Sequence, residues 1–458
     1  MIVVMDVLIE GFDPDAMVLA RLLAREGHAV RLAGLAGEPA EAGALRELGI
    51  RVEPHTDLDA DPGRAEIAYL DVWTPEIAPR VGRLRARGTR VSCLGDLLLE
   101  RWRGPSIGIT GTAGKTSTTA LTADILRAAG IDIAVSRGAR AGNLWPTADL
   151  LDHLEPRDEA AEPVLLLELT SSHLAFMHYS PTVAAVVSFW PDHLELHGDL
   201  ARYRAAKETI VRHQRPGDTV VVNADDASAG FAAATPAALS EFSLRRSVDH
   251  GAYLDPARGI VIAGPAGETA LGPVHAQAAY PGNALAAAAI ATAAGVSPSA
   301  IAQGARTSTP LPWRAQPAGT LAGTPVVDDG MAATPRKTAA TLAAYPDHSV
   351  VLIAGGLTDS GGGPVHATPE EHELLELACD EIARTARVAV VFGDAAARLA
   401  VLLRQRRVET HRAADLVEAV AEAARRSTGA EALVFSPMFP LSLEERSRFV
   451  SLVRDLGS

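Results

Sequence analysis

Short apolar runs alternate with helix-like stretches along the first hundred residues of the chain. The stretch "DAMVLARLLAREG" repeats its apolar positions at helical spacing and ends at Gly27. Short runs bounded by turn residues are typical of strands, and they read "IVVMDVLI", "VRLAGL", "IRVEP", "EIAYLDVW" and "TRVSCLG". Because strands that alternate with helices form parallel sheets, we predict a Rossmann-like domain over residues 1–103.

A second series of apolar runs follows that block. The run "SIGIT" leads through a Gly-rich turn into a helical pattern that ends near Gly130, and the strands "PVLLLEL", "TVAAVVSF" and "DTVVVN" come next. The turn-rich segment "EPRDEAAEP" interrupts the series, and an Ala-rich helix after Gly282 and Asn283 closes it. We expect a second domain over residues 104–312, with "TSTPLPWRAQPAG" as an interdomain connection.

The remaining chain repeats the alternation once more. Strand-like runs read "PVVDD", "SVVLIAGG", "VAVVFG" and "EALVFSP", and helical stretches such as "EEHELLELACDEIART" and "AADLVEAVAEAARR" separate them. This pattern predicts a third domain over residues 313–458. The chain as a whole is therefore predicted to have an α/β fold of three domains.

Composition narrows the function classes. The chain has 458 residues, 56 acidic against 42 basic side chains and a net charge of −14, and its basic residues are scattered. A nucleic-acid or anionic-membrane surface would need clustered basic residues, so we expect small-molecule partners instead. The only cysteines, Cys93 and Cys379, lack the spacing of a metal site or a disulfide framework, which suits a reducing cytoplasm.

Two apolar stretches are not expected to be targeting or membrane segments. Its start, "MIVVMDVLIEG", has no basic residues and carries Asp6 and Glu10, so it is interpreted as a strand and not as a signal peptide. The longest apolar run, "ALAAAAIATAAG", is too short to span a bilayer. We therefore expect a soluble cytoplasmic protein.

The stretch "GITGTAGKTSTTA" carries the strongest chemical signal. A strand, a tight glycine turn and a helix follow one another there, and such a turn points backbone N–H groups at a phosphate. Lys115 would reach the β- and γ-phosphates, and Thr116 could bind Mg²⁺. The alternative is a Gly-rich turn that binds nothing, since Ile109 stands where the general phosphate-loop pattern has glycine. The flanking strand and helix favour a nucleotide triphosphate.

The segment "TGTAGKT", residues 110–116, resembles the phosphate loop of the Mur ligases. The resemblance extends over nearly the whole chain and is closest to the branch that adds D-glutamate in peptidoglycan synthesis. It implies three domains: a Rossmann-like N-terminal substrate domain, a central P-loop ATPase domain and a Rossmann-like C-terminal domain for the amine acceptor. Further motifs occur in family order, and they read "GNLWP", "LELTSSHL", "PDHLELHG", "YRAAKETI", "NADD", "YPGNALAA", "PWR" and "VVDD".

This resemblance implies a set of site residues. The nucleotide would contact Thr110, Gly111, Thr112, Gly114, Lys115, Thr116, Ser117, Asn283, Arg314 and Asp329. Two Mg²⁺ ions would be held by Thr116, Glu168, His193 and a carbamylated Lys207. Catalysis would rest on Lys115, Glu168, His193 and Lys207. Substrates would contact Asn143, Thr170, Ser171, Met331, Asp359, Ser436 and Phe439.

The chemistry of these residues agrees with such roles. Mg²⁺ prefers oxygen ligands, and Glu168 and His193 follow strands whose ends meet at one sheet edge. Taken alone, Glu168 could be a solvated carboxylate and His193 a structural histidine. The chain has only three lysines, Lys115, Lys207 and Lys337, and only an amine can capture CO₂ as a carbamate. Lys337 matches no motif and is expected on a helix face.

The segments expected to bind the two substrates both depart from the family pattern. The N-terminal stretches "EGFDPDA" and "RLAGLAG" lack the second glycine and the Asp-Thr-Arg triplet that would read a uridine diphosphate, which counts against a UDP-sugar. Met331 and Asp359 replace lysines on the acceptor side, and Phe439 lies in "SPMFPL", where small and hydroxyl side chains would be expected. These side chains suit D-glutamate poorly, so we expect a different amine. That amine would be a cation, which the Asp359 carboxylate would bind.

The sequence thus predicts an ATP-dependent carboxylate–amine ligase that acts through an acyl phosphate. A paralogue of specialised metabolism is favoured, because the nucleotide motifs match the family pattern while the segments expected to bind the two substrates depart from it. A divergent D-glutamate ligase of wall synthesis is the alternative. A P-loop NTPase switch or phosphotransferase, or a binding protein that has lost turnover, remains open. We expect a monomer, with a dimer as the alternative.

Overall fold

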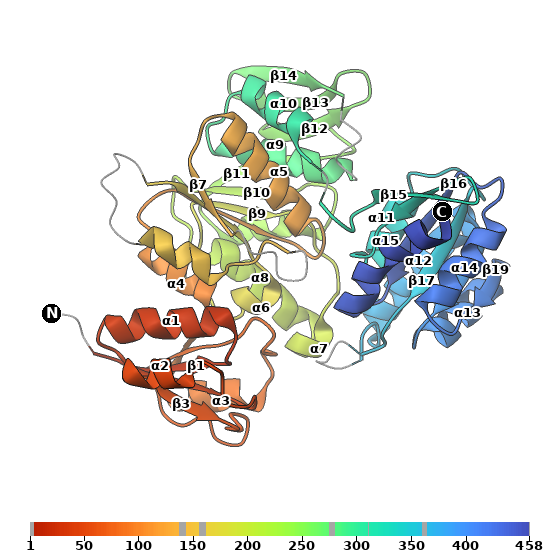
Figure 1. Cartoon of the computed structure of the whole chain (residues 1–458). Coiled ribbons are helices and arrows are strands. Elements are labelled where there is room, and N and C mark those ends of the chain that lie inside the picture. The colour runs from red at the N-terminus through yellow and green to blue at the C-terminus, as the bar shows by residue number, and fades with distance from the viewer. Residues whose placement is uncertain are drawn as a thin grey trace. The chain divides into compact units, whose positions relative to one another are not determined.

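The computed structural model describes residues 4–136, 143–154, 162–273, 280–309, 311–359 and 364–457. Three mainly parallel sheets, each with helices, follow one another along the chain (Figure 1). The predicted α/β class is confirmed. The chain forms two compact units, one of Met1–Trp190, Leu196–His275 and Gly282–Ser308 and one of Pro191–Glu195, Ala276–Pro281 and Thr309–Ser458. The limits of the three predicted domains remain a prediction.

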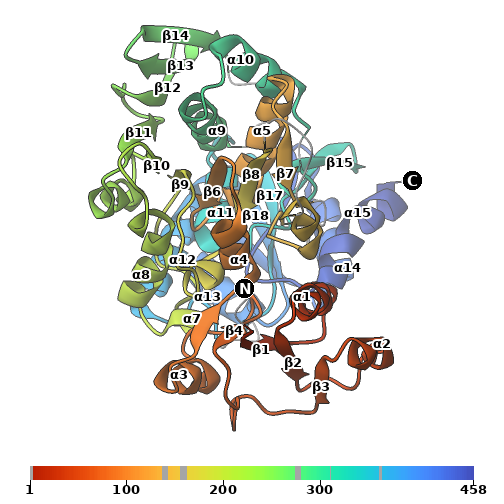
Figure 2. The ribbon, with the colours of Figure 1, turned by 90° about the vertical axis from the view of Figure 1, so that its left-hand side faces the viewer.

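The first sheet is fully parallel and has the strand order β3-β2-β1-β4-β5 (Figure 2). Its strands are β1 (Asp6–Glu10), β2 (Ala29–Gly34), β3 (Arg51–Pro54), β4 (Ile67–Tyr69) and β5 (Arg90–Ser92), and its helices are α1 (Pro14–Arg25), α2 (Ala42–Glu47), α3 (Pro79–Ala86) and α4 (Leu94–Arg101). Asp13 caps α1, and Pro14 stands at its first position, where a missing N–H costs nothing. All five strands predicted for this region are present.

The second sheet has nine strands in the order β14-β13-β12-β11-β10-β9-β6-β8-β7. They are β6 (Ser106–Thr110), β7 (Ile133–Val135), β8 (Val164–Glu168), β9 (Val183–Val186), β10 (Thr219–Asn223), β11 (Ala238–Ser243), β12 (Gly251–Asp255), β13 (Gly259–Gly264) and β14 (Gly267–Gly272). The antiparallel meander from β12 to β14 was not predicted. The linker "EPRDEAAEP" lies largely outside the described residues.

Helices of the second sheet include two that pack closely together. The full set is α5 (Lys115–Ala128), α6 (Ser171–Leu174), α7 (Leu194–His197), α8 (Leu200–Arg212), α9 (Pro281–Ala293) and α10 (Pro298–Thr307), with 3₁₀ turns at Ala148–Leu154 and Ala227–Ala234. α5 lies against α10 (Figure 1). A Cβ on Gly304 of α10 would stand only 2.5 Å from the Ile125 Cα of α5. The glycine therefore permits this close helix contact.

The strand register brings three chain segments to one edge of the second sheet. β6 pairs in parallel with β8 on one side and β9 on the other, so that Ile109 lies opposite Glu168 and Thr110 lies opposite Val186. Ligands of open α/β sheets bind beyond the carboxyl ends of the strands. The segments that follow β6, β8 and β9 are therefore the natural place for a site.

The third sheet belongs to the second unit and has the order β15-β16-β20-β17-β18-β19. Its strands are β15 (Gln316–Leu321), β16 (Thr324–Asp328), β17 (Val350–Gly355), β18 (Ala386–Phe392), β19 (Glu409–Arg412) and β20 (Ala432–Met438), and its helices are α11 (Pro335–Leu342), α12 (Pro369–Thr385), α13 (Ala396–Gln405), α14 (Leu416–Arg426) and α15 (Leu443–Gly457). Among the described strands of this sheet only β15 pairs antiparallel, and it occupies part of the predicted interdomain connection.

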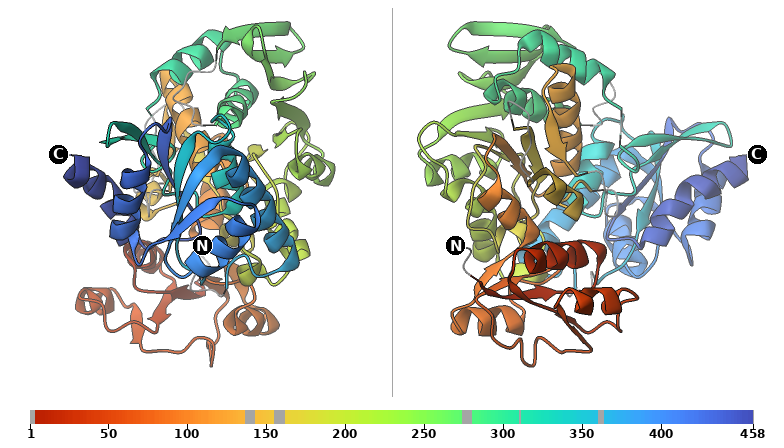
Figure 3. Two further views of the ribbon diagram at one scale, coloured as in Figure 1. Left: turned by 90° about the vertical axis from the view of Figure 1, so that its right-hand side faces the viewer. Right: turned by 60° about the vertical axis from the view of Figure 1, so that its left-hand side comes forward.

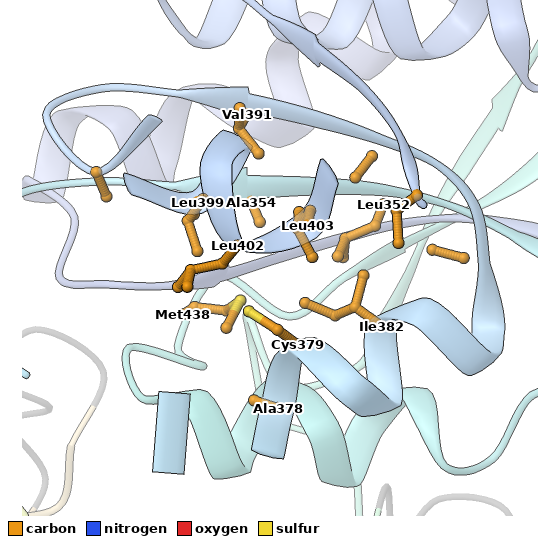
Figure 4. Close-up of a cluster of buried hydrophobic side chains, with 14 of the residues drawn as sticks. Leu352, Ala354, Ala378, Cys379, Ile382, Val391, Leu399, Leu402, Leu403 and Met438 are labelled. Carbon is orange, nitrogen blue, oxygen red and sulfur yellow. The ribbon is translucent and has the colours of Figure 1, made fainter. Parts of the chain in front are cut away.

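Two apolar clusters build the core of this unit, whose sheet and helices are drawn as ribbons in Figure 3. One joins the sheet to α11, α12 and α13, and the other joins it to α14 and α15. Figure 4 shows the first cluster, in which Cys379 of α12 packs beside Ile382 and Met438. The sheet is thus buried on both faces, as its continuous apolar strands predict.

Both cysteines are buried free thiols. Cys93 precedes α4, where its Sγ lies 3.6 Å from the His173 carbonyl oxygen, and Cys379 belongs to the cluster of Figure 4. Burial raises the pKa of both thiols to about 12. None of the described helices has the length and apolar character needed to cross a membrane.

Candidate active site

The phosphate loop joins β6 to α5 and is held in shape by its neighbours. Gly114 ends the loop in the left-handed region at a φ of +83°, and a Cβ there would lie 2.6 Å from the Asn283 Oδ1. The Thr112 Oγ1 lies 2.9 Å from the Tyr203 hydroxyl and donates to the Trp190 carbonyl at 3.1 Å. These contacts hold the loop in place, and Asn283 lies directly beside it. The predicted contact of Asn283 with a nucleotide stays a prediction.

Lys115 begins α5 and folds its side chain back over the loop. Its Nζ donates to the Gly111 carbonyl at 2.9 Å and to the Thr112 carbonyl at 3.3 Å. Ser117 lies in the first turn of the same helix. A lysine in this position can exchange the carbonyl oxygens for phosphate oxygens.

A compact group of oxygen atoms lies next to Lys115. The Thr116 Oγ1 lies 2.8 Å from the Glu168 Oε1 and 3.0 Å from the Asn143 Oδ1. The other carboxylate oxygen of Glu168 accepts from the Leu144 N–H at 2.7 Å. Glu168 is fully buried and Thr116 nearly so. The sequence placed these residues in separate motifs, and the structure brings them together.

These atoms suit a magnesium ion. Mg²⁺ prefers hydroxyl, amide and carboxylate oxygens and keeps several ligands from water and phosphate. No group of three or more His, Cys, Asp and Glu side chains within the described ranges could hold a metal ion. That Thr116 and Glu168 hold such an ion stays a prediction.

Lys207 approaches the same loop from α8. Its side chain is 1% exposed, and its Nζ donates to the Gly111 carbonyl at 2.9 Å, with the Thr110 Oγ1 at 3.4 Å. The ammonium also lies 4.9 Å from the centre of the Tyr203 ring. Two of the three lysines in the chain thus donate to one carbonyl oxygen, that of Gly111.

His193 lies in the segment 191–195, which belongs to the second compact unit. Its backbone has a φ of +53°, and its half-exposed imidazole lies 3.5 Å from the Glu195 carboxylate and 3.6 Å from that of Asp192. A shared metal site of His193 with Lys207 therefore stays a prediction.

The segment after Glu168 forms the N-terminal cap of the short helix α6. Thr170 precedes α6 and accepts from the His173 N–H at 3.2 Å, while the His173 Nδ1 lies near the Thr170 N–H and hydroxyl. Ser171 is buried at the first position of α6. The proposed substrate contacts of both residues remain predictions.

Asp329 is the best-connected predicted residue of the second unit. It accepts from the Thr341 Oγ1 at 2.7 Å, from the Ser436 Oγ at 2.9 Å and from the Ala315 N–H at 3.2 Å. Burial nevertheless raises the pKa of Asp329 to about 6. Arg314 lies nearby in sequence and donates to the Pro312 carbonyl at 3.1 Å.

The other acceptor-side residues differ in exposure. Asp359 is exposed and Met331 half-buried, whereas Phe439 is fully buried with its ring 4.9 Å from that of His366. Lys337 lies half-buried on α11, and burial lowers its pKa. The contacts of these residues with substrate stay predictions.

Sequence reasoning missed two features. Asp328 is buried beside Asp329, and burial raises the pKa of Asp328 to about 7. A pocket also opens in the first unit where the segment after Asn143 meets the carboxyl ends of β1 and β4, and Trp145, Tyr69 and His173 line it. The two adjacent aspartates in "VVDD" could have indicated the buried Asp328, and the tryptophan in "GNLWP" could have indicated the pocket.

Comparisons with known proteins place the chain in a family. The Mur ligase middle domain model matches residues 109–253. The chain is 34% identical to the UDP-N-acetylmuramoylalanine–D-glutamate ligase of Frankia casuarinae, over 94% of this chain and 88% of that protein. It is 31% identical to the ligase of the same name from Symbiobacterium thermophilum, over 98% and 97%.

Solved structures share the fold. MurF from Acinetobacter baumannii aligns with a TM-score of 0.61 at 19% identity, covering 98% of this chain and 93% of that one. A pseudomurein peptide ligase type C from Methanothermus fervidus aligns with a TM-score of 0.60 at 14% identity, covering 98% and 100%. With the sequence relatives, these findings lead to one conclusion: the chain belongs to the Mur ligase family, whose members are ATP-dependent ligases that form amide bonds.

Proposed function

We propose that the chain joins a carboxylic acid to an amine in specialised metabolism, at the expense of ATP. The carboxylate oxygen attacks the γ-phosphorus, the bond to the β-phosphate oxygen breaks, and ADP leaves with that electron pair. The amine nitrogen then attacks the acyl carbon, phosphate departs with the C–O electron pair, and the amine releases a proton. The products are an amide, ADP and phosphate.

The observation that carries this proposal is the contact between Thr116 and Glu168 at the end of a loop to which the Lys115 ammonium donates. Lys115 would bind the phosphates and stabilise charge on the group being transferred. Thr116 and Glu168 would hold Mg²⁺, which supplies charge neutralisation at the phosphate oxygens. The loop amides from Gly111 to Gly114 would orient the triphosphate, and Asn283 would lie beside it.

Lys207 is proposed to react with CO₂. The ammonium would first lose a proton, and the neutral nitrogen would then attack the carbon of CO₂, form an N–C bond and lose a second proton, which leaves an anionic carbamate. A buried lysine at the loop suits this role, because a carbamate offers two oxygens to a second Mg²⁺. His193 is the proposed partner ligand for that ion.

The substrates are proposed to differ from those of the named relatives. Asn143, Thr170 and Ser171 would face the carboxylate substrate. Met331 and Asp359 replace lysines of the family pattern, so a neutral or cationic amine would fit better than D-glutamate. Arg314 and Asp329 are proposed at the nucleotide.

A divergent D-glutamate ligase of peptidoglycan synthesis is the second candidate. The 34% identity to an enzyme of that name over most of the chain favours it. In either case we propose a cytoplasmic monomer that handles small molecules and comprises domains over residues 1–103, 104–312 and 313–458.

An ADP-release screen over carboxylates and amines, with bicarbonate and Mg²⁺ present, tests the proposal. We expect ADP only when both an acid and an amine are supplied, and UDP-N-acetylmuramoyl-L-alanine with D-glutamate to be inactive. Activity with that pair would select the second candidate. ADP release without an acceptor would indicate an NTPase, and failure to bind ATP would overturn the ligase assignment.

A further inference from the structure

Glu76 and His197 form a carboxylate–imidazole pair between segments of the first and second sheets. Glu76 lies between β4 and α3, and His197 is the last residue of α7. The Glu76 Oε2 lies 2.9 Å from the His197 Nδ1. Because an ionised carboxylate can only accept, the Nδ1 carries the proton, and this hydrogen bond fixes the orientation of the ring. The imidazole is fully buried, so protein contacts alone hold it.

A second contact holds the same two segments together. Ile77 follows Glu76, and Gly198 follows His197. Gly198 has a φ of +91°, and a Cβ on it would stand 3.3 Å from the Ile77 Cγ2. The two segments therefore meet at successive residues, and the position of the Glu76 carboxylate is defined by more than one hydrogen bond.

The imidazole packs against Tyr203 of α8. The ring centres of His197 and Tyr203 are 5.4 Å apart, and the Phe189 ring stacks on Tyr203 at 5.5 Å. Tyr203 is fully buried, so these rings restrict where its own ring can lie. The His197 Nε2 has no hydrogen-bond partner among the described residues. A buried polar group without a partner costs free energy, which favours a role beyond packing.

Tyr203 in turn contacts the phosphate loop and a lysine beside it. Its hydroxyl lies 2.9 Å from the Thr112 Oγ1, which donates its own proton to the Trp190 carbonyl at 3.1 Å. The Tyr203 hydroxyl is therefore the donor to Thr112. The ammonium of Lys207, which donates to the Gly111 carbonyl at 2.9 Å, lies 4.9 Å from the centre of the Tyr203 ring. This distance is within the range of a cation–π contact.

We propose that Glu76 and His197 are positioning residues for nucleotide binding. Glu76 orients His197, His197 holds the Tyr203 ring, and Tyr203 holds Thr112 and Lys207 at the phosphate loop. The segment between β4 and α3 thus contributes to the nucleotide site without touching the nucleotide. The proposal rests on the ligase function above and adds residues of the first sheet to its ATP site. A small displacement of the loop would misdirect the N–H groups that meet the phosphates.

ATP affinity in paired variants tests this inference. The probe is ATP with Mg²⁺, titrated calorimetrically into the full chain at a temperature at which every variant is folded. Glu76→Ala removes the acceptor of the His197 Nδ1–H, and we expect the Kd for ATP to rise at least about fivefold. Glu76→Gln still offers an acceptor oxygen and should keep most of the affinity. A merely structural role would lower Tm without this pattern in Kd.

Tyr203→Phe tests the route of the effect. It removes the hydroxyl that donates to Thr112 and should also raise the Kd for ATP. The double variant of Glu76→Ala with Tyr203→Phe should lose less affinity than the two single losses together, because both changes act on one chain of contacts.

The pair of His178 and Asp96 provides the matched control. The His178 Nδ1 lies 2.9 Å from the Asp96 Oδ2, and this pair also joins a helix of the first sheet, α4, to a segment of the second. Among the described residues, the hydrogen-bond partners of the pair do not include Tyr203 or Thr112. His178→Ala should therefore lower Tm and leave the Kd for ATP unchanged.

Four results would each overturn the inference. They are an unchanged Kd in Glu76→Ala, an equal loss of affinity in Glu76→Gln, an equal loss in His178→Ala, and additive losses in the double variant with Tyr203→Phe. A wild type that binds no ATP would overturn the ligase assignment and this inference together, so the two failures are told apart by the wild-type titration.

Discussion

Thr116 and Glu168 are joined by a hydrogen bond of 2.8 Å although 52 residues separate them. The threonine stands in the first turn of α5, and the glutamate is the last residue of β8. Because both side chains are buried, this contact fixes a carboxylate at the mouth of the phosphate loop.

Removing the Thr116 hydroxyl should impair turnover strongly. In Thr116→Val we expect kcat/KM for ADP release to fall at least about 100-fold, because an oxygen at the phosphates is lost. Thr122→Val is the control: Thr122 is buried on the same helix, and its hydroxyl has no hydrogen-bond partner among the described residues. Similar losses in both variants would contradict a specific role for Thr116.

Gly114→Ala should abolish nucleotide binding. The substitution introduces a Cβ 2.6 Å from the Asn283 Oδ1 at a φ of +83°. Gly130→Ala isolates the backbone cost, since Gly130 follows the other end of α5 at a φ of +74° with no atom within 4 Å of its Cβ. We expect both variants to lose about 1 kcal/mol of stability from backbone strain. Only Gly114→Ala should fail to retain ATP in a binding assay.

Carbamylation of Lys207 can be observed directly. Isotopically labelled bicarbonate should give one protein-bound carbamate signal by NMR in the wild type. Because the chain has three lysines, Lys115, Lys207 and Lys337, single Lys→Arg variants assign it completely. We expect the signal to vanish in Lys207→Arg and to persist in Lys337→Arg. A signal that survives Lys207→Arg would refute the assignment.

Asp328 should make the second unit less stable as pH rises. Burial foremost, with the neighbouring Asp329, raises the pKa of Asp328 to about 7 from its unfolded value of 3.8. The folded chain then holds a proton that the unfolded chain has lost, so stability falls between about pH 4 and pH 7. Asp328→Asn should therefore raise Tm at pH 8 and change it little at pH 4.

The exposed Asp347 provides a control for that measurement, because Asp347→Asn removes a carboxylate of the same unit that lies at the surface. Its Tm should follow the wild type at every pH. If Asp328→Asn lowers Tm at pH 8, the buried Asp328 carboxylate does not destabilise the folded unit at that pH, and the prediction is wrong.

Asp96 should stabilise the first unit at neutral pH and lose this effect in acid, which is the reverse of the pH dependence expected for Asp328. Burial opposes ionisation, but hydrogen bonds from His178 and Ser92 prevail and hold the pKa of Asp96 below its usual value. Asp96→Asn should cost roughly 3–5 kcal/mol at neutral pH, since it breaks a buried network. The stability from Asp96 is lost as pH falls through its lowered pKa, so variant and wild type should converge in acid.

Asp61→Asn is the comparison for Asp96. Asp61 pairs with Arg87 at the surface, 2.7 Å away, and solvent screens that pair. Denaturant unfolding at neutral pH should show little change for it. Equal effects of the two variants would contradict a special role for the buried network.

The local elements of the fold could be predicted, but their arrangement could not. The strand, glycine turn and helix around Lys115 follow from short-range pattern, and the structure confirms them. The meander from β12 to β14 was missed because its strands begin at glycines, and β14, which reads "GETALG", is mostly exposed and has no apolar run. Strand order depends on contacts distant in sequence, which no local period encodes.

The candidate site shows the same limit. Gly114 and Thr116 could be named from a motif, and their geometry follows from the loop. The hydrogen bonds of Asp13 with the first turn of α1 depend on side-chain rotamers, and "EGFDPDA" showed only that a glycine was missing. The pocket lined by Asp71 and Trp145 joins chain segments that sequence alone cannot bring together.

The two shielded thiols, Cys93 and Cys379, give the molecule a practical property. A thiol must ionise to attack an electrophile, and neither of these does so near neutral pH. Maleimide dyes should therefore leave the wild type unlabelled. A cysteine engineered at the surface of each unit would react selectively, so fluorescence energy transfer can follow the distance between the units through a catalytic cycle without removal of either native cysteine.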